Sequence, residues 1–149
     1  MKRVVATALL TVGLVAGSLA GAAGASAHAT RIATDPADTA ELTQAPTTVS
    51  ATFNEAMQPQ FAAMTVVGPD GNLWSTGEPK VEGAIVSVGV RPLGPTGTYT
   101  VNYRATSADG HVVSGSWTFE LTVAGTGTPG PSATTADEPA DDAVPLWPF

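Results

Sequence analysis

Between residues 98 and 123 the chain runs Thr98-Tyr-Thr-Val-Asn-Tyr-Arg-Ala105, then Thr106-Ser-Ala-Asp-Gly-His-Val-Val-Ser-Gly115, then Ser116-Trp-Thr-Phe-Glu-Leu-Thr-Val123. Apolar and polar side chains alternate with a period of two in the first and third segments, which is typical of a half-buried β-strand. The dipeptide Asp109-Gly110 between them is a turn signal. The stretch therefore predicts two long strands joined by a loop that carries Asp109 and His111.

The same alternation recurs in residues 48–53, 63–67 and 84–90, and no segment shows the 3.6-residue period of an amphipathic helix. Prolines separate these short runs at regular spacing. We expect about seven strands in one all-β domain over residues 28–123, an antiparallel β-sandwich or barrel. The prolines are Pro36, Pro46, Pro69, Pro79, Pro92 and Pro95.

Residues 1–27 have the pattern of a secretory signal peptide. Lys2 and Arg3 precede an apolar stretch that is shorter than the roughly 20 residues needed to span a bilayer. Ala25-Ser26-Ala27 fits the small-x-small rule for cleavage, so the mature chain is expected to begin at His28, outside the cytoplasm. Two other cuts also fit that rule, after Ala20-Gly21-Ala22 and after Ala23-Gly24-Ala25.

Residues 124–149 are rich in proline, glycine and acidic residues, a composition that buries little apolar surface and predicts a disordered tail. The tail ends in the apolar run Val144–Phe149. The sequence leaves open whether this run is a chain end or the beginning of a membrane anchor. We expect no membrane span in the mature chain as given.

Charge and cysteine content exclude several classes of function. After residue 27, four bases face all 13 acids, a formal charge of −9 that disfavours binding to nucleic acid or anionic lipid. The chain has no cysteine, so disulfides, zinc-thiolate sites and thiol redox chemistry are not available. The four bases are Arg31, Lys80, Arg91 and Arg104.

The chain has two histidines, and cleavage would place His28 at the N-terminus. Its free amine, with a reference pKa of about 8, and its imidazole, at about 6.5, could then chelate one metal ion. His111 follows Asp109 by two residues, so both side chains project from one face of an extended chain. Three nitrogens with one oxygen suit Cu(II). Spacing alone leaves two alternatives open, an arbitrary residue at position 28 and a structural Asp109–His111 hydrogen bond.

Several segments together resemble the CopC family of extracytoplasmic copper-binding proteins. They are His28-Ala29, Pro36-Ala37-Asp38, Phe53-Asn54-Glu55, Gly97–Val101, Tyr103–His111, Ser114-Gly115 and Phe119. The resemblance covers residues 28 to about 123 and implies a Greek-key β-sandwich or barrel of cupredoxin-like or immunoglobulin-like type. It further implies one Cu(II) ion bound by His28, Asp109 and His111. It also implies that Glu55 lies behind these ligands and that copper passes to a membrane transporter or another acceptor. We expect the protein to be a monomer.

Two features depart from the family pattern. Val112 and Tyr103 replace a frequent proline and tryptophan, and both substitutions keep apolar or aromatic character. Family members that also bind Cu(I) use a methionine-rich loop, whereas this mature chain has only Met57 and Met64. Because soft thioethers select Cu(I), we expect a Cu(II)-only protein, with Met64 in the core.

Two other classes of function compete with a non-enzymatic copper carrier. Lytic polysaccharide monooxygenases also bind copper through an N-terminal and a second histidine on a β-sandwich. They need a flat aromatic surface, for which Trp74 is the candidate because Trp117 is expected in the core and Trp147 in the tail. The second class is a metal-free β-sandwich interaction module.

Overall fold

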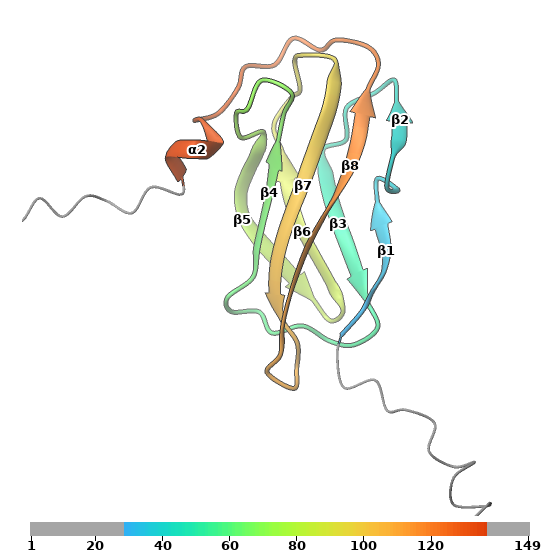
Figure 1. The fold of residues 1–149 in the computed structure, drawn as a ribbon, viewed down its shortest axis with the longest axis vertical. Helices are drawn as coiled ribbons and strands as arrows, with labels where there is room; N and C mark the ends of the chain where they lie inside the picture. Colours follow the sequence, from blue (N-terminus) through green and yellow to red (C-terminus); the bar gives the residue numbers. More distant parts are fainter. Residues whose placement is uncertain (1–28, 137–149) are drawn as a thin grey trace, which may run out of the picture.

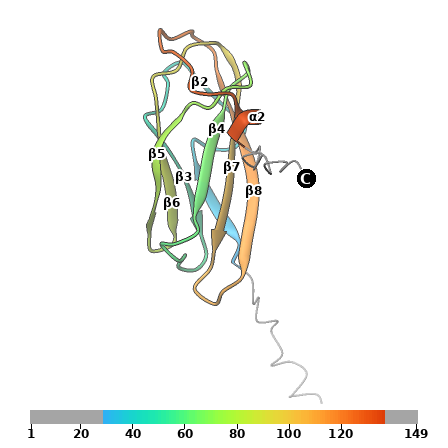
Figure 2. The ribbon, with the colours of Figure 1, turned by 90° about the vertical axis from the view of Figure 1, so that its left-hand side faces the viewer.

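The computed structural model describes residues 29–136 and consists of eight strands in two packed layers (Figures 1 and 2). This confirms the predicted all-β sandwich. The strands are β1 (Arg31–Asp35), β2 (Ala40–Leu42), β3 (Thr48–Phe53), β4 (Ala63–Val67), β5 (Ser75–Glu82), β6 (Ile85–Val90), β7 (Gly97–Thr106) and β8 (Val112–Leu121), followed by the short helix α2 (Ala133–Ala136).

The two sheets have the strand orders β1-β3-β6-β5 and β2-β8-β7-β4. Two details differ from the prediction. There are eight strands rather than about seven, and β2 pairs with β8 in parallel while the other strand pairs are antiparallel. The strands without a clear sequence signal, β1, β2 and β5, all lie at sheet edges, where few side chains are buried and alternation is therefore weak.

The predicted alternation is confirmed where both layers face each other. Inward side chains of β3, β6, β7 and β8 form one continuous apolar core, while their neighbours along each strand are more exposed. The core residues of these strands are Val49, Ala51, Phe53, Val86, Val88, Val90, Tyr99, Val101, Ala105, Trp117, Phe119 and Leu121.

Tyr99 holds the centre of an aromatic cluster in this core. Its ring stacks on Phe119 with centroids 5.4 Å apart and meets Trp74 edge-on at 6.2 Å. Its hydroxyl donates a 2.7 Å hydrogen bond to the Pro95 carbonyl. Burial, with a contribution from the negative charge of Asp70, raises the pKa of Tyr99 to about 12. A phenolate at this position is therefore strongly disfavoured.

We predict that stability falls as pH rises from about 10 to about 12. The folded pKa of Tyr99 lies above the unfolded value of about 10. The contribution of its neutral hydroxyl to the free energy of unfolding is therefore complete below pH 10 and is lost as pH approaches 12. Urea unfolding across this range measures the loss. Tyr99→Phe has no titrating hydroxyl and should show a flatter profile; an unchanged alkaline loss in this variant would assign it to other groups.

Residues 124–136 differ from the predicted tail because they pack along the end of the sandwich. Backbone bonds join Gly125 N to Gly94 O at 2.8 Å and Gly127 N to Leu93 O at 3.0 Å. A Cβ on Gly127 would lie 1.6 Å from the Pro92 carbonyl oxygen, so glycine permits this close approach. The composition of this segment predicted disorder because composition carries no information about backbone hydrogen bonds to a distant part of the chain. Residues 137–149, including Val144–Phe149, lie outside the described residues.

Candidate metal centre

The loop at residues 107–111 is a tight turn at the tip of the β7–β8 hairpin. Gly110 N donates to Ser107 O at 2.9 Å, and Ser107 N donates to His111 O at 2.8 Å. Gly110 has a φ of 89°, in the region that favours glycine. This confirms the turn predicted at Asp109-Gly110. Because ten residues of each strand pair in register below it, the turn has a rigid base.

The turn brings Asp109 and His111 together. His111 Nδ1 lies 3.0 Å from Asp109 Oδ2, and the two side chains are 52% and 39% exposed. The backbone N–H of His111 also donates to Asp109 Oδ1 at 3.2 Å. The two predicted ligands thus form one polar group that solvent can reach.

The fully buried Ser107 fixes the carboxylate of this pair. Its hydroxyl donates a hydrogen bond to Asp109 Oδ1. This bond, followed by the one with His111, lowers the pKa of Asp109 to about 2. Asp109 is therefore an anion throughout the neutral and mildly acidic range and offers a negatively charged oxygen without competition from protons. The spacing of Ser107 and Asp109 was visible in the sequence, but the burial of the serine was not.

Glu55 lies between this turn and the beginning of the domain. Asn54 exchanges two hydrogen bonds with Thr30, from its backbone N–H to Thr30 O at 2.9 Å and from Thr30 N to its Oδ1 at 2.8 Å. On the other side of Glu55, Ala108 N donates to Ala56 O at 2.9 Å. Figure 1 shows the first described residues and the β7–β8 turn at the same, lower end of the sandwich.

Glu55 carries an unusual buried oxygen. Its Oε1 is shielded from solvent and has no hydrogen-bond partner among the residues of the described part of the chain. Burying a carboxylate oxygen without a donor is costly. A cationic or N–H donor from outside residues 29–136 would fit at this point. His28, the remaining predicted ligand, lies just outside that range.

The two mature-chain methionines are both in the core, with Met57 5% and Met64 3% exposed. Met64 lies in β4, as predicted. Met57 follows the Glu55 segment and forms a β-bridge with Ser107. Their thioethers are therefore closed to solvent, which argues against an accessible Cu(I) site built from them.

Trp74, the candidate platform of the alternative oxidative enzyme, is 0% exposed and therefore offers no surface to a substrate. Its Nε1 donates to Asp70 Oδ1 at 2.9 Å, beyond the end of β4. Trp117 is 2% exposed in the core, as predicted, and Trp147 lies outside the described residues. The other departures from the family pattern fit the fold. Tyr103 meets Phe53 edge-on at 5.6 Å, and Val112 is 52% exposed beside His111.

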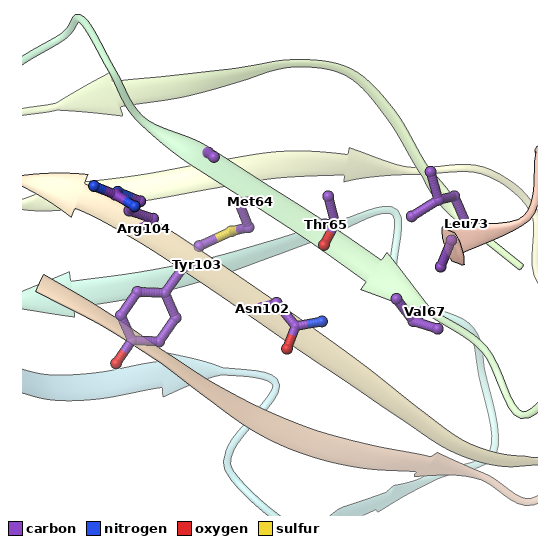
Figure 3. A pocket seen from close by; sticks show the side chains of 9 residues that line it. Met64, Thr65, Val67, Leu73, Asn102, Tyr103 and Arg104 are labelled. Carbon is purple, nitrogen blue, oxygen red and sulfur yellow. The ribbon is translucent and has the colours of Figure 1, made fainter. Parts of the chain in front are cut away.

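Other surface features do not extend this centre. Within residues 29–136, no group of three or more His, Cys, Asp or Glu side chains is arranged to hold a metal ion. A groove along β4 and β7 contains no residue of the 107–111 turn. The residues that line it include Met64, Thr65, Val67, Leu73, Asn102, Tyr103 and Arg104 (Figure 3). None of the helices in the described residues has the length and apolarity to cross a membrane.

The fold and the site together define the class of this protein. It is a small all-β sandwich domain with a polar Asp-x-His turn at one end. Residues 32–122 match the CopC domain model, and the chain belongs to the CopC family. The matched range contains Glu55, Asp109 and His111.

Individual relatives agree with this assignment. Protein YobA of Escherichia coli K12 is 32% identical over 119 residues, which cover 78% of this chain and 91% of YobA. The copper transport protein CutJ of Bacillus subtilis is 31% identical over 97 residues, 63% of this chain but only 18% of CutJ.

Two solved structures share the fold. CopC from Methylosinus trichosporium OB3b has a TM-score of 0.53 at 22% identity, covering 63% of this chain and 93% of that one. PcoC, described as a methionine-rich copper resistance protein from Escherichia coli, has the same TM-score and identity and covers 64% of this chain and 100% of PcoC.

Proposed function

We propose that this protein is an extracytoplasmic carrier that binds one Cu(II) ion through His28, Asp109 and His111. The observation that carries the proposal is the convergence of three segments at one end of the sandwich. Hydrogen bonds through Asn54 hold Thr30 beside Glu55, and Ala56 is bonded to the turn that presents Asp109 and His111. His28 precedes Thr30 by two residues, which span about 7 Å when extended.

The donor chemistry supports Cu(II) over other ions. An N-terminal histidine offers an amine and an imidazole, to which His111 adds a second imidazole and Asp109 an anionic oxygen. Cu(II) leads the divalent first-row ions at such sites and prefers tetragonal nitrogen and oxygen ligands. The names of CutJ and PcoC, a copper transport and a copper resistance protein, point to the same metal.

The contact between Asp109 and His111 constrains how the imidazole would bind. Nδ1 of His111 lies 3.0 Å from the carboxylate, so copper at Nε2 would leave that contact intact. The carboxylate would then orient the ring, as carboxylates do for many metal-bound histidines. Direct binding of Asp109 to the same ion would require this pair to separate, because Nδ1 and Nε2 point to opposite sides of the ring. Glu55 Oε1 would accept a hydrogen bond from the His28 amine, which would satisfy an otherwise unpartnered buried oxygen.

Secretion is part of this mechanism. Until residues 1–27 are removed, the nitrogen of His28 belongs to a peptide bond and offers no amine. The high-affinity site therefore forms only outside the cytoplasm. A monomeric carrier of this kind would sequester Cu(II) or deliver it to an acceptor such as a membrane copper transporter.

Native mass spectrometry of the secreted protein, with and without Cu(II), tests the proposal directly. The full chain is expressed with residues 1–27, so that the host removes them. We expect a mature mass that begins at His28 and gains one copper ion. A mature chain that begins elsewhere, or one that retains no copper, would contradict the proposal.

A further inference from the structure

β2 pairs with β8 only over Phe119–Leu121, and other groups of the chain bond to the remainder of that edge of β8. Thr39 N donates to Thr118 O at 2.7 Å, and Thr118 N donates to Asp38 Oδ1 at 3.1 Å. Alternate residues of a strand direct their polar groups to the same side. Ser116 therefore faces this edge too, nearer the turn. Its carbonyl accepts a 3.1 Å hydrogen bond from Nη1 of Arg31.

The Arg31 guanidinium also packs on two aromatic rings of the hairpin. Its Cζ lies 5.6 Å from the centroid of Tyr103 and 5.7 Å from that of Trp117, within cation–π range. Nη1 lies 3.4 Å from the Tyr103 hydroxyl. Figure 3 shows the Tyr103 ring extending from β7 towards the blue β1 strand. One side chain of β1 thus contacts both strands that support the Asp109–His111 turn.

Two local features make room for this contact. The pairing of β1 with β3 shifts register between Arg31 and Ala33, and Ile32 is 64% exposed. Such a bulge redirects the neighbouring side chains. On β8, Gly115 lies opposite Tyr103, and a Cβ there would approach the Tyr103 hydroxyl to 2.5 Å. The glycine therefore leaves space for the phenol beneath the guanidinium.

We infer that Arg31 is a positioning residue for the metal centre, an inference that rests on the proposed function. Asn54 holds Thr30 on the Glu55 side. The side chain of the next residue, Arg31, bonds to the β7–β8 hairpin. Together the two anchors fix residues 30 and 31, which would limit where His28 can lie relative to His111. Without the second anchor, the amine and imidazole of His28 could still chelate copper, but His111 would join them less often.

Substitution Arg31→Met tests this role, because methionine keeps an apolar stem and removes the guanidinium. We expect Cu(II) affinity to fall about tenfold, the lower end of what loss of a supporting contact costs a metal site. The copper absorption and electron paramagnetic resonance spectra should move towards fewer nitrogen donors. Arg104→Met is the matched control, since Arg104 is an exposed base on β7 and its loss changes the charge equally.

A double-mutant cycle with His111→Ala separates positioning from general stabilisation. If Arg31 acts by bringing His28 to His111, then Arg31→Met should have little further effect on affinity once His111 is gone. Additive effects, or equal effects of Arg31→Met and Arg104→Met, would overturn the inference. Arg31→Lys keeps the charge without the planar stacking surface and should give an intermediate affinity. It also serves if the methionine variant folds poorly.

Hydrogen exchange in the metal-free protein provides a readout that does not depend on copper. The Thr30 amide, bonded to Asn54 Oδ1, should exchange faster in Arg31→Met than in Arg104→Met. Unchanged protection would overturn the anchoring step even if copper binding were lost. If His111→Ala leaves Cu(II) affinity unchanged, the proposed function fails; if His111→Ala weakens binding and Arg31→Met does not, only the role of Arg31 fails.

Discussion

One alanine added before His28 should weaken Cu(II) binding by more than about 100-fold, the upper end of the cost of losing a supporting contact. The addition converts the amine of His28 into a peptide nitrogen and removes a direct ligand. It also breaks the chelate that amine and imidazole form on one residue. A new chelate would require a metal to deprotonate the Ala–His peptide nitrogen, at a cost that rises as pH falls.

Isothermal or competition titration with Cu(II) measures this loss, and urea unfolding checks the fold. The free energy of unfolding should not change, because the addition precedes the described strands. One alanine inserted after Gln44 is the matched control, since that residue lies in the exposed turn between β2 and β3. Equal affinities of the two variants would show that the amine is not a ligand.

Trp74→Ala should lower the free energy of unfolding by about 3–5 kcal/mol, the usual cost of removing a large buried aromatic side chain. The ring is fully buried and meets Tyr99 edge-on at 6.2 Å. The backbone packs closely against it, because a Cβ on Gly68 would lie 2.4 Å from its Nε1. Such tight surroundings can collapse only partly into the cavity that alanine would leave.

Urea unfolding again provides the measurement, with Trp74→Phe as the control. Phenylalanine keeps most of the packing but loses the hydrogen bond to Asp70, so we expect a cost of about 1–3 kcal/mol. Cu(II) affinity of the folded variants should not change, because Trp74 adjoins Val66, near the end of β4 away from the Asp109–His111 turn. A loss below about 1 kcal/mol in Trp74→Ala would contradict the packing role.

The parts of the fold that sequence predicted best are those whose signals are local. A period of two, sustained through residues 98–105 and 116–123, identifies β7 and β8 because half-buried strands impose it. Asp109-Gly110 identifies the turn between them because glycine tolerates its positive φ. The contact of Asp109 with His111 also follows from their spacing, so the sequence predicted that these two side chains lie together.

The edge strands and the 124–136 segment were beyond such signals. Backbone pairing with a neighbouring strand defines β1, β2 and β5. Most residue types are compatible with such pairing, so these strands leave little signal in the sequence. Residues 124–136 have the composition of a linker, yet their glycines allow close backbone contact with residues 92–94. The structure of the edge strands and of residues 124–136 depends on which part of the folded chain lies beside them. A short stretch of sequence does not contain this information.

The sequence by itself determined the class of fold, the Asp109–His111 turn, and the chelating potential of a histidine that follows a cleavage signal. Each depends on residues that are close together in the chain. Only the tertiary structure decided that Thr30, Glu55 and the turn meet at one end, that Ser107 is buried beneath Asp109, and that Arg31 joins β1 to the hairpin. These contacts join residues far apart in sequence, and they form only when the two sheets pack and their edges need partners.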